Sequence, residues 1–153
     1  MLALGIELVE GFSRLGAKVV LIPMQPSQDL PLLREIAQAV PSRVGLLQED
    51  LSPRETLAFV SAMDAVVGMR LHSLIFSCIS GVPCVGLVYD PKVRNFLDEV
   101  GQPSLPIEDA TACVVVDECR SIMSETDPES LLFNVERLKK RARAGLQVIY
   151  RYI

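Results

Sequence analysis

An arginine and a histidine lie two residues apart near the middle of the chain, within the run GMRLHS at residues 68–73. The guanidinium of Arg70 is a planar cation whose N–H groups match a carboxylate or a phosphate. His72, the one histidine of the sequence, has a side chain that titrates near neutral pH. Gly68 permits close approach of a ligand or of another backbone segment. The run predicts a site that binds an anion and moves a proton; the alternative is a structural, hydrogen-bonded histidine at a helix start.

A second group of polar residues, Tyr89 to Lys92, follows the next apolar run along the chain. If the two apolar runs form neighbouring parallel strands, Tyr89 and Lys92 come out at the same sheet edge as Arg70 and His72. Two cations and a histidine around a helix N-terminus would suit a small polyanion. Alternatively, the Asp-Pro pair between them forms a turn, and Lys92 is a solvated residue of a first helical turn.

Three other polar residues are expected at this edge. Ser73 could donate to the same anion or cap its helix, and capping is the favoured role. Gln25 and Asp29 follow an earlier apolar run and therefore face the same edge. Gln25 is a candidate ligand contact, whereas an N-cap role is favoured for Asp29.

Hydrophobic periodicity predicts the elements that position these residues. Short β-branched runs are typical of parallel strands buried on both faces, and Ser52-Pro53 with Glu55 is a helix-start signal. The predicted helices cover residues 2–15, 29–40, 53–63, 71–80 and 92–100, and the predicted strands cover 17–24, 44–48, 64–69 and 82–89. This alternation predicts an α/β fold with a Rossmann-like, doubly wound, mainly parallel sheet and helices on both faces.

The pattern weakens after Gly101. Residues 104–107 are expected to form a short edge strand, residues 110–124 are favoured as a helix on length, and residues 128–152 form a long terminal helix. Residues 136–143 of that helix are mostly basic. They include one acidic residue, Glu136, and five basic ones: Arg137, Lys139, Lys140, Arg141 and Arg143. A solvated face is the favoured interpretation, and contact with anionic lipid is the alternative.

Composition restricts the class of function. The chain has 153 residues and a formal charge of −4, from 15 basic and 19 acidic residues. Its length predicts one domain over residues 1–153, and mild acidity argues against nucleic-acid binding. No apolar run approaches the ~20 residues of a membrane span, and no signal-peptide pattern stands at Met1, so we expect a cytoplasmic protein.

The cysteines are expected to be structural. Cys78, Cys84, Cys113 and Cys119 include no C-x-x-C pair, and the single histidine lies in another kind of segment. This spacing favours four buried free thiols and argues against a metal site or a disulfide.

The predicted elements begin on a helix, whereas a doubly wound half normally begins on its central strand. We therefore hypothesise that these residues form the C-terminal part of a longer, two-domain protein, with an exposed sheet edge that could pair.

Residues 66–93, VVGMRLHSLIFSCISGVPCVGLVYDPKV, resemble the polysaccharide pyruvyl transferase family, and the likeness extends over about residues 1–110. The sequence looks most similar to bacterial members that modify secondary cell-wall polysaccharide for S-layer anchoring. The resemblance implies a glycosyltransferase-B-like fold of two Rossmann-type domains, this chain being the C-terminal half. It implies transfer of enolpyruvyl from phosphoenolpyruvate to a sugar, which gives a pyruvate ketal and phosphate.

In that family the histidine of R-L-H is the proposed general acid/base, which maps to His72. The resemblance assigns Arg70 and Lys92 to the donor anion and leaves Leu71 to contribute its backbone N–H. Ser73 and Tyr89 are further candidate substrate contacts. The implied acceptor is a lipid-linked amino-sugar saccharide that contains N-acetylmannosamine, at the inner face of the cell membrane, and no cofactor or metal is expected.

Two other functions stay open. One is a nucleotide-sugar glycosyltransferase or epimerase-like domain, which lacks support because no G-x-G-x-x-G is present. The other is a non-catalytic Rossmann-like binding module in which His72 is structural. Because the implied N-terminal domain is absent from this sequence, we expect weak phosphoenolpyruvate binding and no activity from this chain alone.

Overall fold

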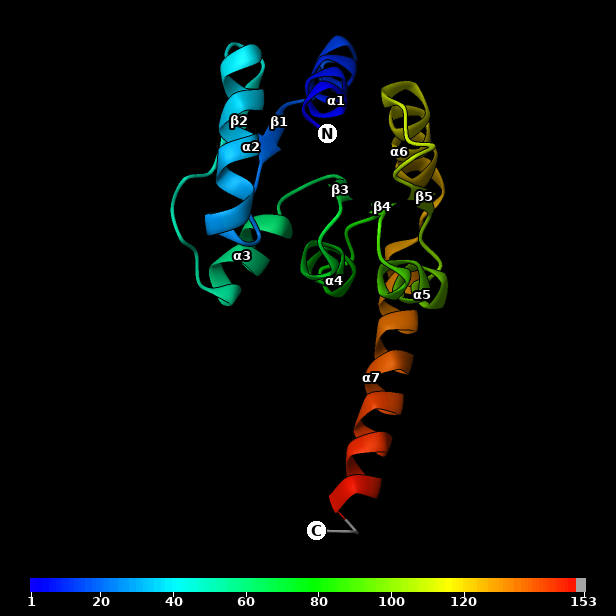
Figure 1. Cartoon of the computed structure of the whole chain (residues 1–153). Coiled ribbons are helices and arrows are strands. Elements are labelled where there is room, and N and C mark those ends of the chain that lie inside the picture. The colour runs from blue at the N-terminus through cyan, green and yellow to red at the C-terminus, as the bar shows by residue number, and fades with distance from the viewer. Residues whose placement is uncertain (151–153) are drawn as a thin grey trace.

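Helices and short parallel strands alternate along the chain from α1 to α7 (Figure 1). The computed structural model describes residues 1–150, and the side chains of residues 1–144. The elements are α1 (Leu2–Arg14), β1 (Val19–Leu21), α2 (Pro26–Ala39), β2 (Val44–Leu46), α3 (Pro53–Val60), β3 (Val66–Gly68), α4 (Leu71–Ile79), β4 (Cys84–Val88), α5 (Pro91–Val100), β5 (Ser104–Pro106), α6 (Ala112–Glu125) and α7 (Pro128–Tyr150).

The strands form two parallel sheets with helices on both faces. β1 pairs with β2, and β4 lies between β3 and β5. Helices α1, α2 and α6 lie on one side of the strands, and α3, α4 and α5 lie on the other (Figure 1). The arrangement confirms the predicted α/β, doubly wound, Rossmann-like fold. It differs from the expectation of one continuous sheet, because no described strand joins β1 to β3.

Two local signals end or begin helices as predicted. The Ser52 hydroxyl accepts from the Glu55 N–H at 3.4 Å, and the Glu55 carboxylate accepts from the Ser52 N–H at 2.9 Å, which is a complete capping box at the start of α3. Gly101 ends α5 with φ of 74°, a left-handed conformation that glycine adopts without a Cβ penalty. The predicted helix over 110–124 is also present as α6.

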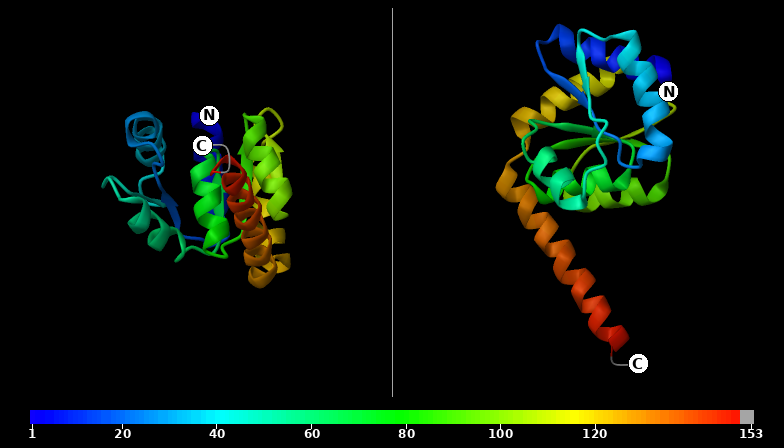
Figure 2. Two further views of the ribbon diagram at one scale, coloured as in Figure 1. Left: turned by 90° about the horizontal axis from the view of Figure 1, so that it is seen from below. Right: turned by 90° about the vertical axis from the view of Figure 1, so that its left-hand side faces the viewer.

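Most of the hydrophobic core packs against the sheet formed by β3, β4 and β5. Leu74 and Cys78 of α4 pack with Leu97 of α5 and with β4, all of whose residues are buried. Leu131 and Val135 extend this cluster into the first turns of α7, and the rest of α7 projects away from the body of the molecule (Figure 2).

The basic residues of α7 are partly engaged with acidic groups. Arg137 donates to the Glu99 carbonyl at 3.3 Å, Arg141 pairs with the Glu99 carboxylate, and Lys139 pairs with Glu136 at 2.6 Å. None of the helices within residues 1–150 combines the length and the apolar character that a membrane crossing requires.

The expectation of four buried thiols is wrong for one cysteine. Cys78, Cys84 and Cys119 are buried, whereas Cys113 lies on the solvent side of α6 and is exposed. The helical period explains the difference, because Cys119 and Val115 share the face that packs inward and Cys113 does not.

Candidate functional site

The polar residues singled out in the sequence gather where β3 ends and α4 begins. Arg70 is the N-cap residue of α4, with extended backbone angles, and His72 lies in the first helical turn. Gly68 is required by its own neighbourhood, because a Cβ at this position would collide with the Ser73 hydroxyl. The close approach that Gly68 permits is therefore one between β3 and α4.

Ser73 is engaged within its own helix. Its side chain is buried, with 5% exposure, and its hydroxyl donates to the Arg70 carbonyl at 2.6 Å. This bond fixes the turn that presents Arg70.

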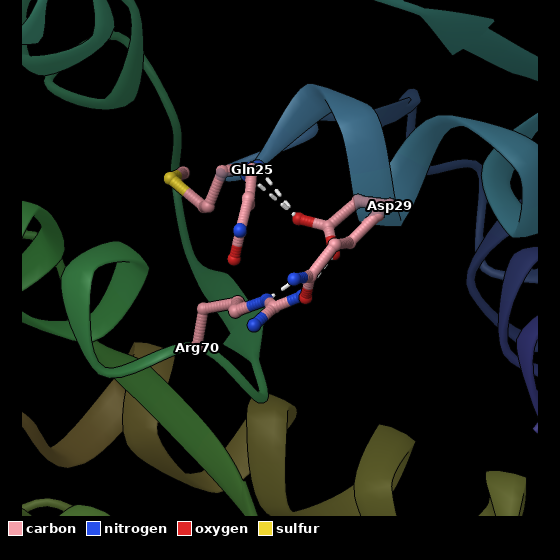
Figure 3. Close-up of polar contacts among 5 residues, drawn as sticks. Gln25, Asp29 and Arg70 are labelled. Atoms are coloured by element: carbon pink, nitrogen blue, oxygen red, sulfur yellow. Dashed lines mark hydrogen bonds and ion pairs between the residues drawn. The ribbon is translucent and has the colours of Figure 1, made fainter.

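Arg70 is held by the start of α2. Its Nη2 lies 2.7 Å from Oδ1 of Asp29 and donates to Oε1 of Gln28 at 2.9 Å, and its Nε donates to Asp29 Oδ1 at 3.2 Å (Figure 3). The pKa of Arg70 is raised, chiefly by the hydrogen bond to Asp29. The guanidinium is therefore a fixed cation tied to a segment 41 residues away.

The N-cap role predicted for Asp29 is wrong. Helix α2 starts at Pro26 with Gln25 as its N-cap residue, so that Asp29 lies inside the first turn. The other carboxylate oxygen of Asp29 accepts the backbone N–H groups of Met24 at 3.0 Å and Gln25 at 2.8 Å (Figure 3). Proline favours the first helical position, which moves the start of the helix three residues before the predicted one. Asp29 thus orients Arg70 through one carboxylate oxygen and accepts the backbone N–H groups of Met24 and Gln25 through the other.

Lys92 lies at the start of α5, directly after β4. Its Nζ is 2.9 Å from Oδ2 of Asp90, and its backbone N–H donates to Asp90 Oδ1 at 2.9 Å. The pKa of Asp90 is lowered by hydrogen bonding to the side chain and the backbone of Lys92, and the pKa of Lys92 is raised in return. Asp90 is the N-cap residue and Lys92 is exposed, so the turn and first-turn positions of the alternative interpretation are both present.

Tyr89 lies near both cations. It is 54% exposed, and it adds a smaller effect to those of Asp29 and Asp90 in raising the pKa values of Arg70 and Lys92. Since β3 and β4 are paired and parallel, their carboxyl ends place these three residues at one edge, as the sequence predicted.

His72 lines a cavity formed by the segments that follow the carboxyl ends of β1 and β2. Its side chain is exposed and lines a cavity of about 220 Å³ with Phe76, with Met24 after β1 and with the segment that follows β2. Two carboxylates, Glu49 and Asp50, belong to the lining. Neither Arg70 nor Lys92 lines the cavity. The imidazole thus lies between an edge that carries the cations and a recess with apolar and acidic walls.

Sequence reasoning missed the partners of Arg70. Asp29 was expected at the correct edge, but Gln28 was not singled out, and the contact of both with the guanidinium depends on where the start of α2 lies relative to the end of β3. The available signal was that Arg70 and Asp29, which carry opposite charges, each follow a predicted strand at the same sheet edge. Among the described residues, no three His, Cys, Asp or Glu side chains gather closely enough to hold a metal ion.

A comparison with known families gives one match. A family model described as polysaccharide pyruvyl transferase matches residues 4–91, which is more than half of the chain. The match includes Gly68, Arg70 and His72, and it ends one residue before Lys92. No solved structure matches the chain.

Proposed function

Since this chain belongs to the polysaccharide pyruvyl transferase family, we propose that it binds the donor for transfer of an enolpyruvyl group from phosphoenolpyruvate to a sugar of a cell-wall polysaccharide precursor. Membership makes it part of a transferase, and the donor, the acceptor and the roles of individual residues are the proposal. The observation that carries the proposal is the grouping of Arg70, Tyr89 and Lys92 at the carboxyl ends of two paired parallel strands.

The donor carries a phosphate and a carboxylate, and this edge offers two cations beside the N-terminus of α4. The side chains of Asp29 and Asp90 now contact those cations. Asp29 also accepts two backbone N–H groups, so it is expected to stay and hold Arg70 in place. Lys92 is exposed, and among the described residues it forms an ion pair with Asp90 alone, so its Nζ can turn to a donor anion.

His72 is proposed as the general acid/base. Formation of the ketal joins two sugar oxygens to C2 of the enolpyruvyl group and breaks its bond to the phosphate oxygen. One hydroxyl proton ends on the methylene carbon, which becomes a methyl group, and the other ends on the phosphate. An exposed imidazole beside the cation edge can carry such a proton, a role that typically contributes about 10²–10⁴-fold to rate.

The acceptor is proposed to reach His72 from the cavity side. Carboxylates of Glu49 and Asp50 can accept hydrogen bonds from sugar hydroxyls, and they would repel a second anion. By resemblance, we propose a lipid-linked, N-acetylmannosamine-containing acceptor at the inner face of the membrane and a role in S-layer anchoring. A second Rossmann-type domain opposite this edge would contribute the remaining contacts.

Titration of the chain with phosphoenolpyruvate tests the donor assignment. His72 is the one histidine of the sequence, so its imidazole C–H signals need no assignment in an NMR spectrum. We expect phosphoenolpyruvate to shift these signals weakly and saturably, and the shift to disappear in an Arg70→Gln variant. Uridine diphosphate is the comparison ligand. A shift with the nucleotide and none with phosphoenolpyruvate would favour the glycosyltransferase-like function instead.

A further inference from the structure

We propose that the cavity at the amino-terminal ends of β1 and β2 is a second anion site, which takes a ligand carrying one or two phosphate groups. We call it the basic cavity; residues 13–14, 16–19 and 41–45 line it. Its volume of about 590 Å³ lies within the ~300–1,000 Å³ of small-molecule sites. The cavity that His72 lines is at the carboxyl ends of the same strands, and the two cavities share no residue. This second site is therefore independent of the proposed function.

Three basic residues line the basic cavity, and the part of the chain that the structure describes contributes no acidic residue to it. Arg14 ends α1, Lys18 directly precedes β1, and Arg43 directly precedes β2. Val19 and Val44 are register partners in the parallel pair. The residues just before them, Lys18 and Arg43, therefore begin neighbouring strands side by side. The pairing of β1 with β2 thus brings two like charges together.

The cations of the basic cavity are poorly neutralised. Lys18 and Arg43 are exposed, and neither takes part in an ion pair among the described side chains. Arg14 has an acidic neighbour in Glu10, whose Oε2 lies 3.9 Å from the arginine Nη1, and both side chains are exposed. Exposed pairs of this kind contribute little. Since the whole chain has a net charge of −4, the cluster is not a consequence of a generally basic surface.

Helix ends explain part of this cluster. Helix α1 ends at Arg14 and α2 ends at Ala39, so the partly negative C-terminal ends of both helices lie beside the basic cavity. A cation near such an end stabilises the helix modestly. This effect accounts for one basic residue at each helix end. It leaves the third charge unexplained, and it leaves the repulsion between the adjacent Lys18 and Arg43 without compensation.

A phosphate group suits the donors of the basic cavity. The guanidinium groups of Arg14 and Arg43 can each donate two parallel N–H bonds to phosphate oxygens, and the Lys18 ammonium adds a third positive charge. Ser13 and Ser42 also line the cavity. The buried Ser13 hydroxyl has no hydrogen-bond partner among the residues described, which is uncommon, and a ligand oxygen would supply one. Three positive charges exceed the charge of one phosphate, about −2, so diphosphate should bind more tightly.

Titration of the intact chain with inorganic phosphate and inorganic diphosphate, in a phosphate-free buffer of low ionic strength, tests the proposal. We expect saturable shifts of the Val19 and Gly45 amide NMR signals, and binding of diphosphate at least about fivefold tighter than that of phosphate. Arg43→Gln should weaken diphosphate binding about tenfold or more, because a fork that contacts phosphate is lost. Lys18→Gln is a second variant at a separate strand start and should also weaken it.

Arg120→Gln is the matched control for these variants. It removes the same charge from a side chain on α6 that does not line the cavity, and Arg120 is 66% exposed, as Arg14 is. This control should bind diphosphate as the wild type does. Absence of shifts at the Val19 and Gly45 amides would overturn the proposal, and so would equal binding in the wild type, Arg43→Gln and Lys18→Gln.

Vesicles distinguish a free ligand from a lipid headgroup as the source of the phosphate. The comparison is sedimentation with vesicles of phosphatidylglycerol and phosphatidylcholine against vesicles of phosphatidylcholine alone. Binding to the anionic vesicles that falls in Arg43→Gln would assign the site to a headgroup. Diphosphate binding without vesicle binding would assign it to a free ligand. Vesicle binding that Arg43→Gln leaves unchanged, with no diphosphate shifts, would place the contact elsewhere and overturn the proposal.

Thermal stability separates a ligand site from purely structural cations. Without phosphate, Arg43→Gln should leave the Tm unchanged or raise it, because repulsion from Lys18 is removed. At about ten times its dissociation constant, diphosphate should raise the Tm of the wild type about 3 °C more than that of the variant. A lower Tm without ligand, together with equal increases on adding diphosphate, would show that Arg43 only stabilises the fold and overturn the proposal. The donor assignment is measured at His72 instead, so the two fail separately.

Discussion

The side chains at the proposed site differ in how firmly they are held. Arg70 is fixed by three hydrogen bonds to Gln28 and Asp29, whereas Lys92 is exposed and pairs with the N-cap residue of its own helix. His72 is exposed beside a cavity. A rigid cation, a movable cation and an accessible imidazole are a suitable set for binding a small anion and then transferring a proton.

Replacing His72 separates a chemical role from a structural one. In the proposed two-domain enzyme, His72→Ala should lower ketal formation by about 10²-fold or more. The Tm should stay within about a degree, because an exposed side chain contributes little to the core. Near-normal turnover would remove His72 from the mechanism, and a large fall in Tm would favour a structural histidine.

The shape of the Arg70 side chain matters as much as its charge. Arg70→Lys keeps the positive charge but loses the planar fork that contacts Asp29 through both Nε and Nη2. We expect a several-fold increase in the KM for phosphoenolpyruvate with a smaller change in kcat. Lys92→Arg is the matched control, since it tests whether a fork is equally acceptable at the movable position. An unchanged KM for Arg70→Lys would contradict the donor role.

At the scale of single elements, helix starts decide where the site residues point. Asp90 caps α5 and pairs with Lys92. Ser52 and Glu55 cap α3, whose first turn lines the cavity with His72. These caps act over three residues or fewer. Their effects are therefore local and can be tested one helix at a time.

The capping box of α3 makes a pH-dependent contribution. The pKa of Glu55 is lowered by its hydrogen bonds to the side chain and the backbone of Ser52. A lowered pKa in the folded state stabilises the fold above the unfolded value, near 4.5, and this contribution is lost as the pH falls through the lower folded value. Ser52→Ala should cost about 1 kcal/mol near neutral pH and shift the pKa of Glu55 upward.

Urea unfolding of both proteins at pH 6 and pH 3, with NMR titration of the Glu55 carboxyl, measures this effect. The difference in stability between wild type and Ser52→Ala should shrink at the lower pH. Thr111→Ala, which removes the N-cap side chain of α6 without involving a carboxylate, is the matched control. A difference that stays constant between the two pH values would contradict the assignment.

At the scale of the whole molecule, the two sheets are joined by contacts other than strand pairing. Helix α1 packs on both, and the Arg70–Asp29 pair ties the end of β3 to the start of α2. The side chains of Arg70 and Asp29 are 32% and 18% exposed, so this ion pair is better shielded than the others on the described surface. The link between the two sheets therefore depends on helix packing together with this ion pair.

Loss of the Asp29 carboxylate should destabilise the fold, because the Arg70–Asp29 pair joins the end of β3 to the start of α2. Asp29→Asn keeps the size of the side chain but removes the charge that holds Arg70 and weakens the bonds from Met24 and Gln25. We expect a loss of about 1–3 kcal/mol in the free energy of unfolding. Gln28→Ala, which removes a single neutral acceptor from Arg70, should cost less. Equal losses in the two variants, measured by urea unfolding, would contradict this account.

The sequence alone determined the features that depend on near neighbours. The alternation of helices and strands, the capping box at Ser52, the left-handed end of α5 at Gly101 and the polar edge after β3 and β4 were all predictable. Each of these follows from hydrophobic period or from hydrogen bonds within a few residues. The start of α2 was displaced because a proline at the first helical position outweighed an aspartate as the cap.

Only the tertiary structure decided which distant groups meet. Nothing within a few residues of Arg70 indicates that its partner is Asp29, 41 residues earlier, or that His72 lines a cavity with the segment after β2. Such contacts depend on how helices pack across the sheets, and a pattern read along one chain does not contain those distances. The division into two sheets is of the same kind, since pairing between strands is a long-range property that each strand's own residues allow but do not specify.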